Sequence, residues 1–506
     1  MSTNNESSFL NDSSQFLTIP VVERFFSDTL TPIEIFHSLK DDACFLLESK
    51  DDLSSWSRYS FIGLSPFLML YEENGTYYAE NKNERLFIGS TLQEVYDRVV
   101  AHLKVKVPQV ELPFSGGAVG YVGYDAVSLF EKVPEHRERK AAFKRVYLQF
   151  CKTLLAFDHV KKELTVIEYV RLKGNESEAQ KIEQLHKAKQ QINTLTSRLN
   201  CPNDGLPVQN LIPHVESDVF EQVTSNYEKA DFLKDVEQIK EYIRAGDIFQ
   251  AVLSQRFSRD ITVSGFELYR MLRMVNPSPY LFYLVADGVE YIGSSPERLI
   301  QIQDGHLEIH PIAGTRKRGA TQSEDDALGE ELLNDEKERA EHFMLVDLAR
   351  NDIGRVSSYG SVQTPVLMEL TKFSHVMHLI TKVTGEIAST VTPLDALMAA
   401  FPAGTVSGAP KIRAMEILNE LEPTTREAYA GAVCYIGFDG NIDSCIAIRT
   451  MIKKGNTVHV QAGAGIVADS VPEMEYEETQ NKARALLETI ERAETMFSTK
   501  GEELHA

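Results

Sequence analysis

The chain has little cysteine, and its cysteines are scattered. There are five, an odd number with no C-x-x-C pair: Cys44, Cys151, Cys201, Cys434 and Cys445. This pattern argues against a disulfide framework and against a cysteine zinc site, so we expect small buried side chains instead. No cysteine stands in a G-x-C-x-G turn, which excludes a thiol glutaminase within this chain.

Basic residues and long apolar runs are also scarce. The 506 residues carry a net charge of −22, and the only dense basic run is Arg316-Lys317-Arg318. A polyanion such as DNA would therefore meet mostly repulsion. No uninterrupted apolar stretch approaches the roughly 18 residues of a membrane helix, and the first residues do not have the pattern of a secretory signal. We expect a cytoplasmic protein.

The hydrophobic pattern predicts an α+β fold, with largely antiparallel sheets packed together and flanked by helices. Short apolar runs separated by turn residues fill residues 16–171, which favours antiparallel strands. Further strands are expected at 431–438, 442–452 and 458–462, joined by Asp-Gly and Gly-Asn turns. The segment 117–125 resembles 431–439, which indicates equivalent strands in two related sheets.

The best candidate for a domain boundary is the Pro- and Gly-containing stretch 200–218, which follows a polar, exposed helix expected at 176–199. A capping box at 225–228 predicts the start of the next helix. We therefore predict four segments: an N-terminal tail (1–24), a first domain (25–215), a second domain carrying the catalytic groups (216–495) and a C-terminal tail (496–506).

Two helical stretches present acidic side chains in a pattern that suits a metal. Glu341 shares a helix face with Leu345 and Leu348, and Glu475 and Glu478 lie three residues apart on a second helix. Two helices could present these carboxylates to one Mg²⁺ ion, which one or two carboxylates usually hold together with substrate and water. The alternative is that the acids are solvated helix starts favoured by the helix dipole.

Other segments could bind an anion. Arg449 stands in the apolar run 445–452, expected as a strand, where its guanidinium would bind a carboxylate or form a structural ion pair. Gly463 and Gly465, in an expected loop, would let backbone N–H groups approach an anion, although the third glycine of a dinucleotide fingerprint is missing. Gly314 and Thr315 stand in a similar expected turn. A plain turn is the alternative for both loops.

Two titratable residues are candidates for proton transfer. Glu297 follows a strand end and could act as a general acid if burial raised its pKa. His378 lies in a mixed environment, where a histidine is more often a satisfied core residue than a catalyst. The combined groups would suit a small substrate with two carboxylates and a leaving group.

Four longer motifs carry a family resemblance: HPIAGTRKRG, DEKERAEHFMLVDLARND, FPAGTVSGAPKIRAMEI and QAGAGIVADSVPEMEYEETQNKA. Through them the chain resembles the chorismate-utilising enzymes, most closely the anthranilate synthase component I group, from about residue 30 to 490. The resemblance implies that Mg²⁺ is held by Glu341 and Glu478 and bridges to the ring carboxylate of chorismate. It also implies that Glu297 protonates the departing C4 hydroxyl as ammonia adds at C2, and that His378 assists the loss of pyruvate.

The resemblance further implies the substrate contacts. Tyr429 and Arg449 would bind the enolpyruvyl carboxylate. The ring side would be contacted by Gly314 and by Thr315, which we also count among the catalytic residues. The ring carboxylate would be bound by the amides of Gly463, Ala464 and Gly465.

Two positions bear on the choice within the family. Gln250 stands where isochorismate and salicylate synthases have a lysine base, and Ala313 stands where one type of aminodeoxychorismate synthase has a lysine nucleophile. The main prediction is the large subunit of anthranilate synthase, in the first committed step of tryptophan synthesis. An aminodeoxychorismate synthase without the lysine stays open, as does, with less support, an isochorismate or salicylate synthase. A non-catalytic tryptophan-binding regulator and an acidic scaffold explain fewer of the motifs.

The resemblance also implies regulation and a partner. Ser49 and the run Pro279, Tyr280 and Leu281 would line a feedback site for L-tryptophan. The alternative is an ordinary strand and a proline-rich turn, with the sole tryptophan, Trp56, in the core. A separate glutamine amidotransferase subunit would supply ammonia, in a hetero-oligomer of two large and two small subunits.

Overall fold

A computed structural model of the chain describes residues 5–50, 58–140, 142–200, 218–372 and 376–497. Strands and a few helices make up the first half, as the apolar runs predicted. These elements are α1 (Glu6–Asp12), β1 (Thr18–Phe26), α2 (Pro32–Ser38), β2 (Ala43–Glu48), β3 (Tyr59–Glu73), β4 (Thr76–Glu80), β5 (Arg85–Gly89), α3 (Leu92–Leu103), β6 (Gly117–Val122), the 3₁₀ helix η2 (Tyr124–Leu129), β7 (Val146–Asp158), β8 (Glu163–Arg171) and α4 (Glu178–Asn200).

The second half contains α11, the longest of the described helices. Its elements are β9 (Thr224–Ser225), α5 (Lys229–Arg244), β10 (Gln250–Asp260), α6 (Gly265–Val275), β11 (Tyr280–Ala286), β12 (Val289–Ser295), β13 (Arg298–Gln303), β14 (His306–Ile309), β15 (Ile312–Lys317), α7 (Gln322–Asn334), α8 (Glu336–Gly354), β16 (Gln363–Lys372), β17 (Val376–Glu386), α9 (Pro393–Ala400), η3 (Gly404–Val406), β18 (Gly408–Ala409), α10 (Lys411–Leu421), β19 (Ala432–Gly437), β20 (Ile442–Ile446), β21 (Thr450–Lys454), β22 (Thr457–Ile466) and α11 (Pro472–Phe497).

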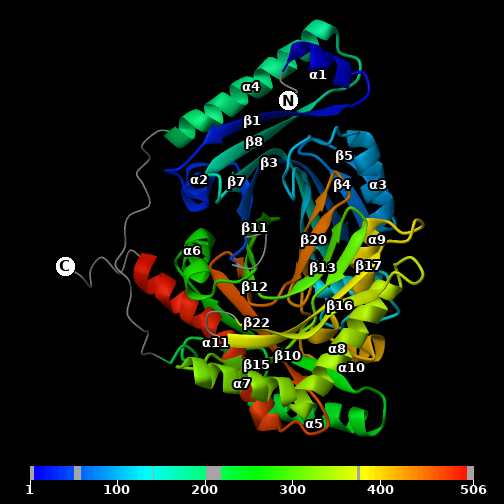
Figure 1. The fold of residues 1–506 in the computed structure, drawn as a ribbon, viewed down its shortest axis with the longest axis vertical. Helices are drawn as coiled ribbons and strands as arrows, with labels where there is room; N and C mark the ends of the chain where they lie inside the picture. Colours follow the sequence, from blue (N-terminus) through cyan, green and yellow to red (C-terminus); the bar gives the residue numbers. More distant parts are fainter. Residues whose placement is uncertain (1–4, 51–57, 141, 201–217, 373–375, 498–506) are drawn as a thin grey trace, which may run out of the picture.

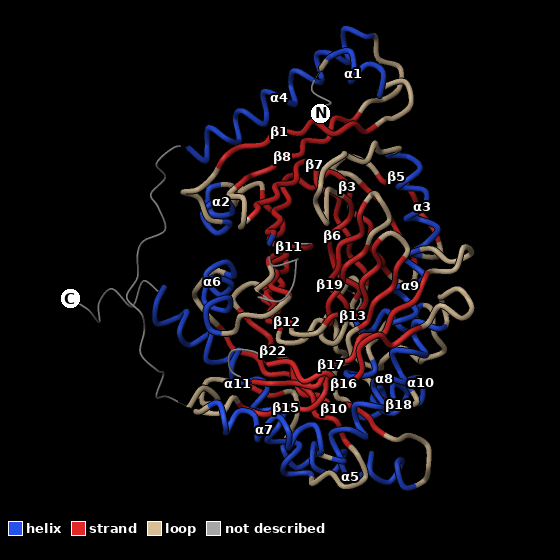
Figure 2. The backbone as a smooth tube through the Cα atoms, viewed as in Figure 1, coloured by secondary structure: helices blue, strands red, loops and turns tan. Residues whose placement is uncertain are grey.

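The strands form one connected, 22-stranded system with antiparallel pairing, flanked by helices, which confirms the predicted α+β class. In Figure 1, α1 and α4 cover one end of the molecule, and α5, α7 and α10 lie at the opposite end. Figure 2 shows the strands running through the interior between these helical layers. No helix in the described part of the chain combines the length and the apolar character needed to cross a bilayer.

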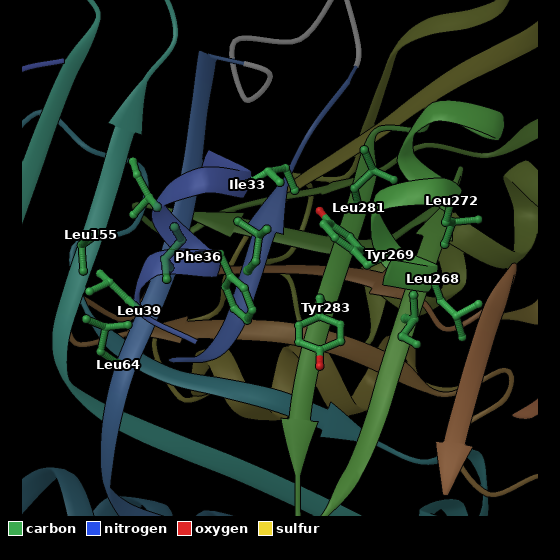
Figure 3. Close-up of a cluster of buried hydrophobic side chains, with 14 of the residues drawn as sticks. Ile33, Phe36, Leu39, Leu64, Leu155, Leu268, Tyr269, Leu272, Leu281 and Tyr283 are labelled. Atoms are coloured by element: carbon green, nitrogen blue, oxygen red, sulfur yellow. The ribbon is translucent and has the colours of Figure 1, made fainter. Parts of the chain in front are cut away.

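Strand pairing joins the two halves of the chain. β2 of the first half pairs with β11 of the second, and β6 pairs with β19. The halves also share a hydrophobic core in which α2 faces α6 (Figure 3), with Phe36 against Phe266 and Tyr283 at ring distances of 4.7 and 5.3 Å. The predicted boundary at residue 215 lies outside the described residues, and no gap in the sheet separates the two halves within them.

The two similar segments, 117–125 and 431–439, lie next to each other. Their strands, β6 and β19, pair antiparallel with Gly117 opposite Gly437 and Val122 opposite Ala432. Two equivalent strands that run side by side in opposite directions are related by an approximate twofold axis between them. The similarity between the two segments therefore corresponds to a local twofold symmetry of the two strands.

Three local predictions were wrong. Residues 5–24 are not a tail, because they form α1 and most of β1, which pairs along its length with β8. The Ser225 capping box does not form: α5 starts after Glu228 without a side-chain cap, and the Ser225 hydroxyl donates to Gln255 instead. α4 is only half exposed, because its apolar face packs into the hydrophobic core that the two halves share.

Candidate active site

Helices α8 and α11 position the predicted metal ligands. α8 begins at an Asp335 cap whose carboxylate accepts from the backbone N–H groups of Lys337 and Glu338. Leu345 is buried on this helix, whereas Glu341, one turn earlier, is exposed. Glu341 is thus an open carboxylate at the edge of an apolar face, not a buried acid in need of a partner.

The acids of the two helices act on one another. Partial desolvation and the negative charges of Glu338 and Glu478 raise the pKa of Glu341. Partial desolvation and the charge of Glu478 likewise raise the pKa of Glu475, although a hydrogen bond to Ser470 opposes this. The negative charge of Glu478 thus raises the pKa of an acid on each helix, and a bound cation would be stabilised at such a place.

Lys482 faces this acidic cluster, as does Lys337, and the sequence reasoning did not give it a role. Its Nζ lies 2.7 Å from Glu478 Oε1 on the same face of α11, and it donates to the Gly463 carbonyl oxygen at 3.0 Å. The pKa values of Glu297 and Glu341 are raised overall, and the positive charge of Lys482 opposes both increases. The four-residue spacing from Glu478 was a signal that could have identified it.

The chemistry of the two predicted ligands is compatible with Mg²⁺. Within the described residues no three His, Cys, Asp or Glu side chains are grouped so that they could hold a metal by themselves. Glu341 and Glu478 offer two carboxylates from two helices, which is the usual protein share of a Mg²⁺ site whose other ligands are substrate and water.

Gly463 and Gly465 do not lie in a loop, as predicted, but inside β22, which pairs with β10 through Ile466. Lys482 donates to the Gly463 carbonyl, so this oxygen points away from β10. In a strand the N–H and C=O of one residue point to the same side, and residues two apart repeat this direction. The Gly463 and Gly465 amides therefore face the side beyond β21, where β22 is unpaired. Ala464 lies between them, so its amide faces β10, and its methyl group is buried.

Arg449 also departs from the prediction. The expected strand 442–452 is interrupted between β20 and β21, and Arg449 has a left-handed φ of 50° in this break. Its backbone carbonyl accepts from the Ser294 N–H at 3.1 Å. Burial lowers the pKa of its guanidinium, and no carboxylate of the described residues forms an ion pair with it. A largely desolvated arginine without a counter-ion is suited to an anionic ligand.

Tyr429 connects Arg449 to the glycine strand. Burial raises the pKa of the Tyr429 hydroxyl to about 12, against the lowering effects of Arg426 and Arg449. A Cβ atom added at Gly463 would lie 3.0 Å from this hydroxyl, and one at Gly465 would lie 2.7 Å from Gln250 Nε2. The two glycines are needed because other side chains already occupy this space.

Glu297 has the environment predicted for a general acid. Burial raises its pKa to about 7, while Thr405 and the charge of Lys482 oppose the shift. Its side chain lines a small cavity of about 40 Å³ that it shares with Thr405 and with Leu345 and Leu348 of α8. A carboxyl group with such a pKa is partly protonated near neutral pH, as proton donation requires.

Gly314, Thr315 and His378 lie together because β15 pairs with β17. His378 Nδ1 is 2.9 Å from the Gly314 carbonyl oxygen and 3.2 Å from Thr315 Oγ1. The expected turn at 310–319 is therefore mostly strand, with a bulge at Gly314, where φ is 68°. A Cβ atom at Gly314 would lie 3.4 Å from a carboxylate oxygen of Glu338, which places this group beside the start of α8.

The predicted regulatory residues line a separate, larger space. A cleft of about 860 Å³ includes Ser49, Pro279, Tyr280 and Leu281 in its wall. They meet because Glu48, just before Ser49, lies opposite Leu281 in the β2–β11 pair. The Ser49 hydroxyl is buried and has no hydrogen-bond partner among the residues described. Trp56, the alternative core residue, lies outside those residues.

Comparison with known proteins identifies the family of the chain. The model of the chorismate binding enzyme family matches residues 42–488. Anthranilate synthase component 1 of Bacillus caldotenax is 55% identical over 99% of both chains, and that of Bacillus subtilis strain 168 is 54% identical over 98% of this chain and 96% of its own. The chain belongs to the anthranilate synthase component 1 group of the chorismate binding enzymes.

Solved structures show the same relationship. The crystal structure of anthranilate synthase component I from Streptococcus pneumoniae TIGR4 matches with a TM-score of 0.74 and 38% identity, covering 91% of this chain and 98% of that one. The menaquinone-specific isochorismate synthase MenF from Escherichia coli, at 20% identity and a TM-score of 0.67 over 96% of this chain and 99% of its own, shares the fold. The large antiparallel sheet is thus that of the chorismate binding enzymes.

Proposed function

We propose that the chain is the large component of an anthranilate synthase, which converts chorismate and ammonia to anthranilate, pyruvate and water. The observation that carries this proposal is Arg449, which is largely buried and forms no ion pair with any described residue, beside Tyr429 and the outward-facing amides of β22. Together these groups form an anion site next to an acidic cluster. Chorismate carries two carboxylates, and this pair of environments suits a substrate of that kind.

Each predicted residue then has a task. Arg449 and Tyr429 bind the enolpyruvyl carboxylate, and the Gly463 and Gly465 amides bind the ring carboxylate. Glu341 and Glu478 would hold Mg²⁺. When bound, the ion supplies positive charge to the ring carboxylate.

The chemistry needs two proton transfers to the substrate. As ammonia attacks C2, the ring double bonds shift and the C4 hydroxyl leaves as water with the proton of Glu297. The added nitrogen loses a proton. In the second step the C2 proton is lost and the bond between C3 and the enolpyruvyl oxygen breaks. The departing group takes up a proton on its methylene carbon and becomes pyruvate. His378, held by Gly314 and Thr315, assists this second step.

Regulation by L-tryptophan belongs to the same proposal. The cleft at Ser49 is separate from the anion site and large enough for an amino acid, and the unsatisfied Ser49 hydroxyl offers a hydrogen bond to a ligand. If tryptophan and chorismate occupy separate sites and oppose each other's binding, each must weaken the other by the same factor.

A glutamine amidotransferase partner is proposed for two reasons. The names of the relatives number them as the first component of an enzyme, and this chain has no glutaminase turn of its own. The assembly of two large and two small subunits and a cytoplasmic location remain predictions.

The test is direct. The purified chain is incubated with chorismate, Mg²⁺ and an ammonium salt at mildly alkaline pH, and anthranilate fluorescence is followed with and without L-tryptophan. Fluorescence that tryptophan suppresses supports both the reaction and its regulation. Loss of chorismate without anthranilate would reject the proposal in favour of an aminodeoxychorismate or isochorismate product.

A further inference from the structure

Two side chains belong to the walls of both spaces described above. The cleft of about 860 Å³ has Ser49 and Tyr280 in its wall, and the cavity of about 40 Å³ has Glu297. Of the described residues, Arg298 and His310 line both spaces. Arg298 follows Glu297 directly in the chain and is the first residue of β13. The proposed regulatory site and the proposed general acid therefore share part of their walls.

Arg298 is attached to the cleft through Tyr280 of β11. Its Nε donates to the Tyr280 hydroxyl at 2.8 Å, and that hydroxyl donates to Asp443 Oδ1 at 3.0 Å. The Arg298 side chain is only 11% exposed. A buried guanidinium donor is costly to leave without an acceptor. A ligand that displaces Tyr280 must therefore either move Arg298 with it or leave one of these donors unpaired.

The other end of the guanidinium is held by Glu308 of β14. Arg298 Nη1 donates to Glu308 Oε1 at 2.6 Å, and His310 Nε2 lies 2.7 Å from the same oxygen. Lys382 of β17 also pairs with Glu308. β17 carries His378 as well. This group of ion pairs thus connects the cleft both to the residue beside Glu297 and to the strand of His378.

The start of β13 is irregular at the position where Arg298 stands. Arg298 lies opposite Cys445 of β20, whereas Ile300 lies opposite Ser444, so the register shifts between them. An extra residue of this kind bends a strand locally and changes the direction in which neighbouring side chains point. Glu297 directly precedes the irregular segment, so a displacement of Arg298 can redirect its carboxyl group.

We propose that Arg298 is a positioning residue that couples the cleft to Glu297. Tryptophan in the cleft displaces Tyr280, and Arg298 passes this displacement to the start of β13, so that Glu297 no longer reaches the C4 hydroxyl of chorismate. The inference rests on the proposed function, which supplies both the regulator and the role of Glu297. Because the lost contact is one with bound chorismate, tryptophan and chorismate weaken each other's binding by one common factor.

The experiment measures the dissociation constant of L-tryptophan by calorimetry with and without saturating chorismate, in Mg²⁺ and without ammonia, so that no anthranilate forms. The ratio of the two constants is the coupling factor, which we expect to be about 5 to 150 in the wild type. Arg298→Met keeps an unbranched side chain and removes the guanidinium, while Glu308 keeps His310 and Lys382 as partners. It should bring the coupling factor close to 1 and leave tryptophan binding without chorismate near the wild-type value. Tryptophan should then bind without inhibiting anthranilate formation.

Two further variants complete the design. Tyr280→Phe keeps the ring in the wall of the cleft and removes the hydroxyl that joins it to Arg298, so it should lose the coupling in the same way. It also replaces Arg298→Met if circular dichroism shows that this variant does not fold. Arg259→Met is the matched control, because Arg259 is 7% exposed and pairs with Glu491 but lines neither space. Its coupling factor should stay at the wild-type value.

The outcomes separate the two levels of the proposal. If the wild-type chain forms no anthranilate, the proposed function fails. If it forms anthranilate but tryptophan neither binds nor inhibits, the regulatory part and this inference fail together. If Arg298→Met folds and keeps the wild-type coupling factor, the inference alone is overturned. It is also overturned if Arg298→Met abolishes tryptophan binding, since Arg298 then belongs to the ligand site, or if Arg259→Met lowers the coupling equally.

Discussion

Replacing Arg449 by glutamine should impair substrate binding without lowering the stability of the fold. Arg449 is largely desolvated, forms no ion pair with any described residue and has a φ of 50°, a conformation that costs a non-glycine residue roughly 1 kcal/mol. If its role is to bind a carboxylate, the folded protein without ligand gains little from it. We therefore expect Arg449→Gln to leave the melting temperature unchanged or slightly raised.

The same change should strongly impair catalysis. A hydrogen bond to a charged group contributes about 1.5–3 kcal/mol, and each 1.4 kcal/mol is about a factor of ten. kcat/KM for chorismate should then fall about 10- to 150-fold, mostly through KM, as measured by anthranilate fluorescence. L-tryptophan binding, measured by calorimetry, should not change.

Arg426→Gln is the matched control. Arg426 is more deeply buried, with 1% of its surface exposed, and it donates to both carboxylate oxygens of Glu422 at 2.7 and 2.8 Å and to two backbone carbonyls. Breaking such a pair leaves a buried charge and should cost about 3–5 kcal/mol of unfolding free energy. If Arg449→Gln instead destabilises the protein as much as Arg426→Gln does, and leaves kcat/KM intact, Arg449 is a structural residue and the anion site is wrong.

Three further predictions concern the other parts of the molecule. Glu341→Gln should abolish Mg²⁺-dependent turnover while leaving tryptophan binding by calorimetry intact; retained activity would remove it from the metal site. Ser49→Ala should shift the tryptophan inhibition curve to higher concentration with little change in the uninhibited rate. An unchanged curve would show that Ser49 does not contact tryptophan. Burial alone would raise the pKa of Glu308, but His310 and Lys382 hold it at about 2, below its ordinary 4.5. The stability it contributes is complete above pH 4.5 and is lost as the pH falls toward 2, so chemical unfolding at the two ends of this range should show Glu308→Gln destabilising only at the upper end.

The parts of the fold that sequence predicted well are those with strong local periodicity. The strands of the first half and the helices carrying Glu341 and Glu478 follow directly from the spacing of their apolar residues. The glycine run 463–465 was assigned to a loop because glycine weakens a strand locally. Pairing with β10 overrides that preference, and the missing side chains leave room for Tyr429 and Gln250.

Other features depend on contacts that no local pattern contains. The apolar neighbours of Arg449 predicted a continuous strand, whereas β20 pairs with β13 and β19 and β21 pairs with β12 and β22, which forces a break between them. No sequence signal places Thr405 beside Glu297, because the two line one cavity only when η3 packs against α8. Lys482 did have such a signal in its spacing from Glu478.

The joining of β2 to β11 has a consequence for how the enzyme can change over time. The proposed catalytic groups all come from residues 297–482, while the cleft takes Ser49 from the first half and Tyr280 from the second. If the cleft binds the end product as proposed, the regulatory site lies at the junction between the two halves of the chain, and the catalytic groups lie in one half. Substitutions at that junction could then change or abolish the regulation without affecting the reaction.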